Sequence, residues 1–410
     1  MVKVLNIQKS PKSAGGAALR LHNALNESDS DSDSYILTLF SDINDNERVI
    51  YPGKMSKVIS WIDDRISSLM EKRRKKEYGL FSYPVLGTDV SKIRQVREAD
   101  IIIIHWVQAG FFNLRSYARL ADLGKPLVVV MHDMWTFTGG CHYSFSCEKY
   151  KSGCFECQVF IRKKQNDLSV RGFEHKQKLF SRFNKLYFVS PSNWLYNCAK
   201  ESVLLNHKPV FHIPNIVDNQ VFKPIDKRAA RHLLNLNPDD KIIAFGAVSI
   251  ASPFKGWNYL QEALEIYKQK SGGSGICVLI FGRGSNSRIK EKIPFTTRFT
   301  GFLKDEYSLV MLYNAADVFV TPSLADNLPT TILESLSCGT PVVGFNTGGI
   351  PEMIEHKSNG YVARYKDSED LAEGIRFCLE SNIEGKLLSQ FSKQTVLSKY
   401  RDLMKNILEF

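Results

Sequence analysis

The chain has 410 residues, of which 43% are hydrophobic and 24% charged, a composition typical of a soluble globular protein and not of a disordered one. This length predicts two or three domains, and no apolar run approaches the ~20 residues of a membrane-spanning helix. Lys and Arg outnumber Asp and Glu by 54 to 43, a net charge of +11, which favours an anionic partner without choosing among nucleotide, nucleic acid and lipid surface. Eight cysteines are too few for a disulfide scaffold and indicate a reducing compartment.

Short apolar runs alternate with helical patterns in the first half of the chain. The opening MVKVLNIQK reads as a strand and not as a secretory signal. The polar run Asn26–Ser34 predicts a solvated loop. The predicted strands are Val2–Ile7, Tyr35–Phe40, Ile101–Val107, Leu127–Met131 and Leu186–Val189. Strands that alternate with helices in this way predict a parallel sheet covered by helices on both faces.

The alternation restarts after a proline-rich stretch at about 207–226, which is the best linker candidate. Predicted strands follow at Lys241–Val248, Ile276–Phe281, Asp317–Val320, Pro341–Phe345 and Gly360–Tyr365, with helices at Trp257–Lys270, Glu306–Ala315 and Thr330–Cys338. The pattern predicts two doubly wound α/β domains facing a cleft, residues 1–212 and 213–392. Ligands of such sheets bind beyond the carboxyl ends of the strands.

The segment Thr321–Ile354 carries the most chemical information. A predicted strand leads into a loop, and Pro329 stands where a helix begins, since its missing N–H costs nothing there. The amino end of that helix suits a phosphate. Asp326 and Glu334 flank it with seven residues between them, and a carboxylate can accept hydrogen bonds from sugar hydroxyls. For either acid alone, a turn residue or a solvated side chain is an equally good interpretation.

Together, the two acids, the following SCGTPVV and the GG-x-P-E resemble the signature of glycosyltransferase family 4, retaining enzymes with the two-domain GT-B fold. The resemblance implies that Asp326 contacts the donor sugar and Glu334 the donor ribose, with Asn327 and Leu328 among the donor contacts. Asp326 stands where the family usually has Glu.

Further stretches resemble the same family from residue 2 to about 400. SAGGAALRLHNAL resembles its glycine loop, in which Gly15 and Gly16 would let the backbone approach a diphosphate; a plain turn is the alternative. FGAVSIASPFKGWNYL matches the loop where Lys255 would grip the diphosphate, although Ala247 replaces the expected arginine. A solvated lysine is the alternative there. Leu303 stands at the position beside the donor base.

In the first domain, His132 follows the strand LVVVM in HDMW. From its position after a buried strand alone, His132 could simply be a packed, hydrogen-bonded histidine. The resemblance instead implies a catalytic histidine near the reacting sugar, oriented by Asp133. The catalytic set is therefore His132, Asp326 and Lys255. The final SKYRDLMKNILEF resembles a helix that returns to the first domain, at about 393–410. The first domain would be the acceptor side and residues 213–392 the donor side.

Four cysteines cluster in an insertion at about 139–160, with the spacing C-x5-C-x6-C-x2-C. Cys141, Cys147, Cys154 and Cys157 are a candidate structural zinc site; disulfides or free thiols are the alternatives. Similar insertions mark a bacterial surface-polysaccharide subgroup that the chain resembles. Such a zinc would brace the loop beside His132, and four thiolates would leave no position for catalysis. No cofactor is expected for the reaction itself.

Residues 56–76, SKVISWIDDRISSLMEKRRKK, combine apolar positions at helical spacing with a basic end. This pattern is typical of an interfacial helix on anionic lipid headgroups, with an ordinary surface helix as the alternative. No nucleic-acid-binding module is present, so no nucleic-acid partner is expected.

The resemblance implies a retaining hexosyltransferase that moves a sugar from a nucleotide-diphosphate sugar, UDP-linked by preference, to a glycan or polyprenyl-linked glycan in bacterial surface polysaccharide synthesis. We expect it in the cytoplasm, peripheral on the inner face of the membrane. Two alternatives stay open. One is another GT-B chemistry, such as a nucleotide-sugar epimerase; the other is a degenerate GT-B scaffold at a membrane surface.

Overall fold

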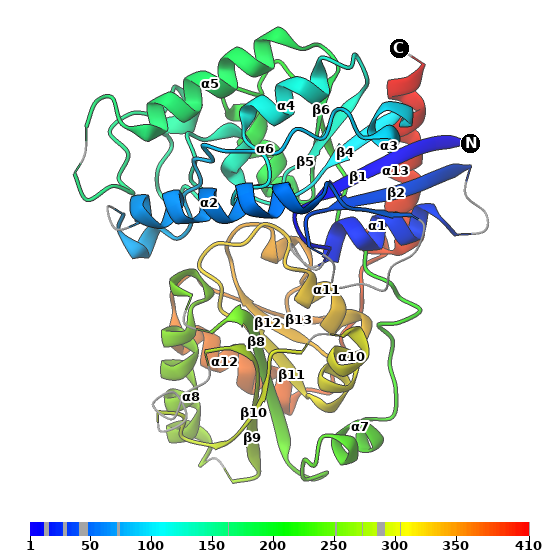
Figure 1. Ribbon diagram of the computed structural model, residues 1–410. Helices are drawn as coiled ribbons and strands as arrows, with labels where there is room; N and C mark the ends of the chain where they lie inside the picture. Colours follow the sequence, from blue (N-terminus) through cyan, green and yellow to red (C-terminus); the bar gives the residue numbers. More distant parts are fainter. Residues whose placement is uncertain are drawn as a thin grey trace. The chain divides into compact units, whose positions relative to one another are not determined.

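The chain divides into two compact units (Figure 1): unit 1 comprises Met1–Ile216 and Lys393–Phe410, and unit 2 comprises Val217–Ser392. The boundary falls four residues beyond the expected position, because Ile213 and Ile216 are buried in a core cluster of unit 1. The computed structural model describes residues 1–11, 16–27, 31–40, 48–71, 74–162, 164–250, 252–272, 274–284, 292–303 and 305–409.

Unit 1 is built on a seven-stranded, all-parallel sheet in the order β3-β2-β1-β4-β5-β6-β7. Its strands are β1 Val2–Gln8, β2 Ser32–Thr38, β3 Val49–Ile50, β4 Ile101–Ile104, β5 Leu127–Val130, β6 Leu186–Ser190 and β7 Val210–His212. Its helices are α1 Ala17–Leu25, α2 Lys54–Glu71, α3 Arg94–Glu98, α4 Leu114–Ala121, α5 Leu168–Arg182, α6 Asn193–Glu201 and α13 Lys393–Leu408.

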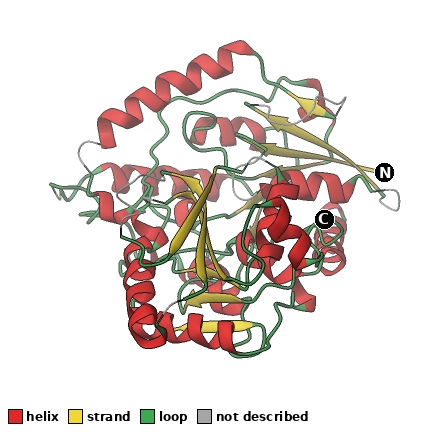
Figure 2. Ribbon diagram, turned by 90° about the horizontal axis from the view of Figure 1, so that it is seen from below, coloured by secondary structure: helices red, strands yellow, loops and turns green. Residues whose placement is uncertain are grey.

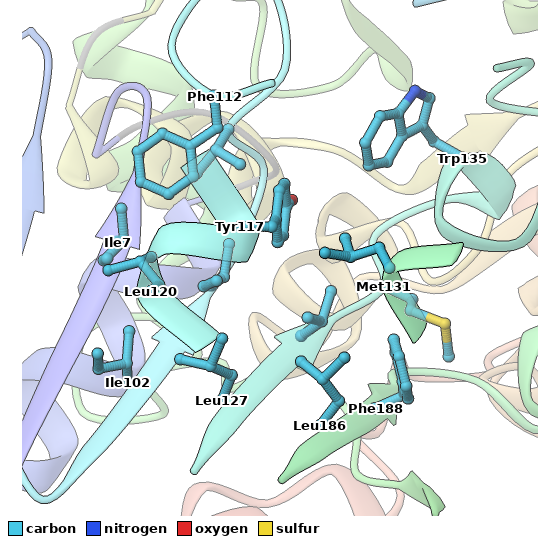
Figure 3. Packing of buried hydrophobic residues seen from close by; sticks show 14 of the residues in the cluster. Ile7, Ile102, Phe112, Tyr117, Leu120, Leu127, Met131, Trp135, Leu186 and Phe188 are labelled. Carbon is cyan, nitrogen blue, oxygen red and sulfur yellow. The ribbon is translucent and has the colours of Figure 1, made fainter. Parts of the chain in front are cut away.

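Alternate residues of each strand serve the two faces of this sheet. On one face, Ile102 and Leu127 pack with Tyr117 and Leu120 of α4 (Figure 3). On the other face, Ile101 belongs to a cluster that includes apolar side chains of α1 and α13. Both faces are therefore covered, as the continuous apolar runs of buried parallel strands predict.

Two details of unit 1 differ from the sequence expectations. The polar run expected to be a loop ends in strand β2, because Ser32–Ser34 pair with Val2–Val4 of β1. Ser34 is fully buried there and accepts a hydrogen bond from Asn6 Nδ2 at 3.0 Å. The expected linker also contains β7, which pairs with β6.

Unit 2 is built on a six-stranded parallel sheet in the order β10-β9-β8-β11-β12-β13. Its strands are β8 Lys241–Ser249, β9 Ile276–Arg283, β10 Thr296–Gly301, β11 Val318–Thr321, β12 Val342–Phe345 and β13 Gly360–Ala363. Its helices are α7 Lys227–Leu233, α8 Trp257–Ser271, α10 Glu306–Ala315, α11 Thr330–Ser337 and α12 Ser368–Glu380. Figure 2 shows this mixture of strands and helices.

The strand orders fix where ligands can bind. The chain reverses its direction of sheet growth between β1 and β4 in unit 1, and between β8 and β11 in unit 2. Crevices form at the carboxyl ends of strands at such switch points. Separately, within the described part of the chain no helix is long and apolar enough to span a membrane.

Candidate functional site

An ion pair marks the switch point of unit 2. Lys255 lies beyond the carboxyl end of β8 and Asp326 beyond that of β11. The Lys255 ammonium donates to Asp326 Oδ2 at 2.6 Å, and both side chains are largely buried, with exposed fractions of 27% and 13%. The interpretation of Lys255 as a solvated loop residue is therefore wrong. The sequence analysis assigned Lys255 to the diphosphate and Asp326 to the donor sugar, and the structure brings these two side chains into contact.

Glycines fix this pair from both sides. Gly256 has φ +68°, and a Cβ built on it would lie 1.8 Å from the carbonyl oxygen of Pro322. The Leu324 amide donates to the Phe254 carbonyl at 2.7 Å, which binds the same two loops again. On the far side, a Cβ on Gly348 would lie 1.8 Å from the Asp326 carbonyl oxygen. The Lys-Gly dipeptide is thus required by close backbone approach as well as by charge.

The second acid of the motif lies on α11 and faces inward. Glu334 is 3% exposed, and its Oε2 accepts a hydrogen bond from the Tyr313 hydroxyl of α10 at 3.0 Å. A buried carboxylate needs such partners, because an unpaired one would pay its full desolvation cost. The interpretation of Glu334 as a solvated side chain is therefore wrong. Leu328 and Asn327 precede the helix and are also buried.

Two further unit 2 positions bear on the diphosphate and the base. Ala247, where an arginine was expected, is buried within β8 opposite Gly282 of β9. The next pair along is Ser249 with Arg283, an exposed arginine at the carboxyl end of β9 whose guanidinium lies 4.8 Å from the Phe302 ring centroid. Leu303 follows Phe302 and packs partly buried against the core. Arg283 was missed because only the strand pairing shows that it lies beside the carboxyl end of β8.

In unit 1, His132 follows β5 and contacts a second histidine. His132 Nε2 lies 3.2 Å from Nδ1 of His105, which follows β4, and His105 Nε2 lies 3.1 Å from Asn6 Oδ1. An amide oxygen only accepts, so His105 donates through Nε2 and His132 must donate to its Nδ1. This row of polar groups places a hydrogen-bonded His132 at the carboxyl edge of the sheet. His105 and Asn6 were not found from the sequence.

Burial controls the charge of both rings. It lowers the pKa of His132 from its ordinary 6.5 to about 4, against an opposing effect of the nearby Asp133 carboxylate. The pKa of His105 is lowered well below 6.5 by burial and by His132. Both imidazoles are therefore neutral at pH 7, and His132 can act there as a hydrogen-bonding group and not as a cation.

Asp133 has partners of its own. Its carboxylate accepts from the Trp135 amide at 2.8 Å and lies 2.6 Å from His142 Nδ1. His142 Nε2 in turn lies 2.8 Å from Ser82 Oγ. The pKa of Asp133 is lowered, because the effects of His142 and the Trp135 amide outweigh its burial. Asp133 thus anchors the cysteine-rich insertion and does not hydrogen-bond His132.

The glycine loop is described only in part. Gly16, with φ +70°, precedes the first turn of α1. Gly15 lies outside the described residues, so the expected diphosphate cradle is represented by Gly16 alone.

None of the four clustered cysteines, all of which the structure describes, forms a disulfide. Burial raises the pKa of Cys154 to about 12 and that of Cys157 to about 11, and the other thiols of the cluster add to the effect. Cys141 pairs with Phe81 in an antiparallel bridge, and the Cys154 sulfur accepts from the Gly139 amide at 3.2 Å. Among the residues that the structure describes, no group of three or more His, Cys, Asp or Glu side chains is placed to hold a metal ion. Structural zinc at Cys141, Cys147, Cys154 and Cys157 stays a prediction from their spacing.

A lysine beside these thiols was also missed. Lys176 of α5 is 1% exposed, donates to the carbonyls of Trp135 and Thr138, and lies 3.7 Å from the Trp135 ring centroid. Burial lowers its pKa to about 7. It ties α5 to the loop that follows His132, which a helix-face pattern in the sequence does not reveal.

Comparisons with known proteins relate the chain to glycosyltransferases. The family model described as Glycosyl transferases group 1 matches residues 239–381, which include the Lys255–Asp326 pair. The chain is 23% identical over 364 residues to the putative colanic acid biosynthesis glycosyl transferase WcaC of Escherichia coli K12, covering 80% of this chain and 83% of that protein.

Solved structures are similar over the whole chain. Sucrose-phosphate synthase from Thermosynechococcus elongatus superimposes with a TM-score of 0.65 at 16% identity, covering 100% of both chains. Anabaena Alr3699/HepE in complex with UDP-glucose gives 0.56 at 16% identity, covering 100% of this chain and 96% of that one. These structures confirm the GT-B fold. The Glycosyl transferases group 1 match and the similarity to WcaC support the resemblance to a surface-polysaccharide type of glycosyltransferase family 4.

Proposed function

We propose that this chain, which its relatives and its fold identify as a glycosyltransferase, transfers a sugar with retention from a UDP-sugar to a lipid-linked glycan of a bacterial surface polysaccharide. UDP-glucose in the Anabaena HepE structure supports the donor class, and the colanic acid role in the name of the E. coli relative supports the acceptor class. The proposal assigns donor binding to unit 2 and acceptor binding to unit 1.

The Lys255–Asp326 pair at the switch point of unit 2 carries this proposal. A donor diphosphate brings negative charge that competes for the Lys255 ammonium and strengthens as the sugar–phosphate bond breaks. Once Lys255 turns to the phosphate, the Asp326 carboxylate becomes available to accept hydrogen bonds from sugar hydroxyls. Without donor, Lys255 and Asp326 thus neutralise each other; with donor bound, Lys255 would contact the diphosphate and Asp326 the sugar.

Further groups of unit 2, and His132 of unit 1, complete the assignment. The amino end of α11 would add to the stabilisation of the leaving phosphate. Arg283 would supply the cation that Ala247 lacks, Leu303 would contact the base and Glu334 the ribose. Neutral His132, held by His105, would hydrogen-bond the reacting sugar. No metal and no cofactor enters this scheme, and the acceptor hydroxyl attacks on the face that the nucleotide leaves.

A thermal-shift panel tests the donor site. A ligand at 100 times its Kd stabilises a protein by about 2.7 kcal/mol, a shift that is readily measured. We expect stabilisation by UDP or a UDP-sugar, and its loss in Lys255→Ala. The matched control is Lys241→Ala, which removes an exposed lysine from the opposite, amino end of β8. Absence of stabilisation by UDP, GDP, ADP and CMP alike would contradict the proposal and favour a non-catalytic scaffold.

Helix α2 supports membrane association, because its polarity is inverted. Ser56, Ser60 and Asp63 are buried, with exposed fractions of 3%, 1% and 0%. The exposed side instead carries large apolar residues: Met55, Val58, Trp61, Ile62 and Leu69. We call this surface the outer face of α2. An apolar stripe bearing a Trp and flanked by basic residues is typical of a helix lying in a lipid interface.

The charges beside the outer face select an anionic membrane as its partner. The Arg65 guanidinium lies 5.0 Å from the Trp61 ring centroid, and Lys54 and Lys57 begin the helix. In vesicle flotation with phosphatidylglycerol, we expect Trp61→Ser/Leu69→Ser to weaken binding at least tenfold, since each side chain contributes roughly 1.5–3 kcal/mol when buried. The control Leu233→Ser/Tyr307→Ser removes equally exposed apolar residues from unit 2. Equal binding by both variants would contradict membrane docking through α2.

A further inference from the structure

A large cavity lies in unit 1 where α2 ends and α5 begins. Its volume is about 660 Å³, within the range of small-molecule sites. Met70 of α2, Phe160, Ile161 and Leu168 give it apolar walls. Phe160 is itself fixed by an edge-on contact with Phe81, with ring centroids 5.0 Å apart. One part of the lining is therefore apolar and is held by a buried hydrophobic cluster.

The rest of the lining is mostly cationic, and its three basic side chains are exposed. Arg162, Lys164 and Arg171 line the cavity, and none of them makes an ion pair with the described residues. The one carboxylate in the lining, Asp167, is already engaged: it accepts from the Ser169 amide at 2.8 Å and from the Cys157 amide at 2.7 Å. The cavity thus offers three free cations beside an apolar wall. That combination fits an anionic group attached to a hydrocarbon chain.

The apolar wall leads to the outer face of α2. Ile161, at the cavity, is 60% exposed, and Leu69, adjacent to Met70, is 65% exposed. A hydrocarbon chain leaving the cavity along these side chains would enter the lipid on which α2 is proposed to lie. A phosphate bound by the three cations would then sit at headgroup depth.

A second, separate cavity lies further towards the amino end of α2. It has a volume of about 200 Å³ and is lined by Asp63, Ser67, Ser82 and Ala109 among others. Asp63 is fully buried, and its Oδ2 has no hydrogen-bond partner among the described residues. Its Oδ1 accepts from the amides of Val85 and Leu86 at 2.9 and 2.8 Å. The Asp63 carboxylate therefore lies beneath the wall of this cavity, and hydroxyl groups of the lining, such as those of Ser67 and Ser82, are suited to a sugar.

We propose that the two cavities hold one ligand, a lipid-linked saccharide phosphate, with its phosphate among Arg162, Lys164 and Arg171 and its sugar in the second cavity. From Met70 to Asp63 the helix rises about 10 Å, so phosphate and sugar subsites lie in sequence along α2. Ala109, at the end of the second cavity, follows β4 and is held by the Lys9 ammonium, which donates to its carbonyl. A ligand placed in this way would extend from the lipid towards the carboxyl edge of the unit 1 sheet, where His132 lies. This inference rests on the proposed function, because it names the acceptor.

Vesicle flotation with the full chain tests the phosphate subsite. The vesicles contain phosphatidylcholine with either polyprenyl phosphate or phosphatidylglycerol, and inorganic pyrophosphate serves as a soluble competitor. The test variant is Arg162→Ala/Arg171→Ala. The control, Lys178→Ala/Lys185→Ala, removes the same charge from exposed lysines at the other end of α5 and just beyond it.

We expect the test variant to lose binding to polyprenyl phosphate vesicles at least tenfold while the control binds as the wild type does. Equal loss in both variants, or equal loss on phosphatidylglycerol vesicles, would overturn the proposal, since general charge attraction would explain it. Complete displacement of the protein by pyrophosphate would also overturn it in favour of a free diphosphate site. UDP stabilisation is recorded for all three proteins. Its absence throughout would count against the donor site alone, whereas its retention in a variant that no longer binds polyprenyl phosphate would isolate the acceptor subsite.

Discussion

Replacing Gly256 by alanine tests whether the Lys255–Asp326 pair depends on backbone contact. The new Cβ would lie 1.8 Å from the Pro322 carbonyl oxygen, far inside contact distance, at a residue with φ +68°. A left-handed non-glycine residue costs roughly 1–2 kcal/mol, and forced overpacking adds about 1–3 kcal/mol. Relief of the contact moves the loop that carries Lys255 away from Asp326. We therefore expect lower stability together with lost UDP stabilisation.

Gly272→Ala is the matched control, because Gly272 has φ +71° and, among the described residues other than its chain neighbours, no atom lies within 4 Å of a built Cβ. It should lose only the conformational part, roughly 1–2 kcal/mol, and keep its UDP response. Urea unfolding gives the two free energies, and thermal shift with UDP gives the ligand response. If Gly256→Ala matched Gly272→Ala in both measurements, close approach to Pro322 would not position Lys255.

Two further results follow from buried polar groups. Tyr313→Phe removes the hydroxyl that donates to Glu334 and should lower the free energy of unfolding by about 1–3 kcal/mol in urea, whereas Tyr307→Phe, on an exposed ring, should be neutral. Folding lowers the pKa of His132 from 6.5 to about 4. Between these pH values His132 is protonated in the unfolded chain but neutral in the folded chain, so the free energy of unfolding must fall as the pH drops from 6.5 to 4. His132→Asn should reduce this fall by up to about 3 kcal/mol in urea titrations at pH 4.5 and 7, and an unchanged fall would show that His132 is not a source of it.

Topology explains why the unit 2 site could be approached from sequence. Lys255 and Asp326 each follow a predicted strand, and parallel strands at a switch point bring their carboxyl ends together. Their direct contact could not be predicted, because it depends on Gly256 packing against Pro322. For the same reason Arg283 was missed: its proximity to the end of β8 comes from the register of β9.

The unit 1 site was less accessible, because its partners come from separate strands. His132 was found through its place after a strand, but His105 and Asn6 were not, although they complete its hydrogen bonds. Each lies on or just after a strand of its own, and nothing local distinguishes it from a packed polar residue. The run at Ser32–Ser34 shows the same effect: composition predicts a loop, yet pairing with β1 makes it a buried strand.

Helix α2 shows what a structure adds to a periodic pattern that fits more than one interpretation. The sequence places six apolar residues on one helical pattern, which fits a core-facing helix as well as a lipid-facing one. The structure divides them: Ile59, Ile66 and Met70 are half-buried, while Val58, Ile62 and Leu69 are exposed. The fully buried positions are Ser56, Ser60 and Asp63. Core packing therefore explains only part of the pattern, and the proposed contact of the exposed residues with lipid would explain the rest.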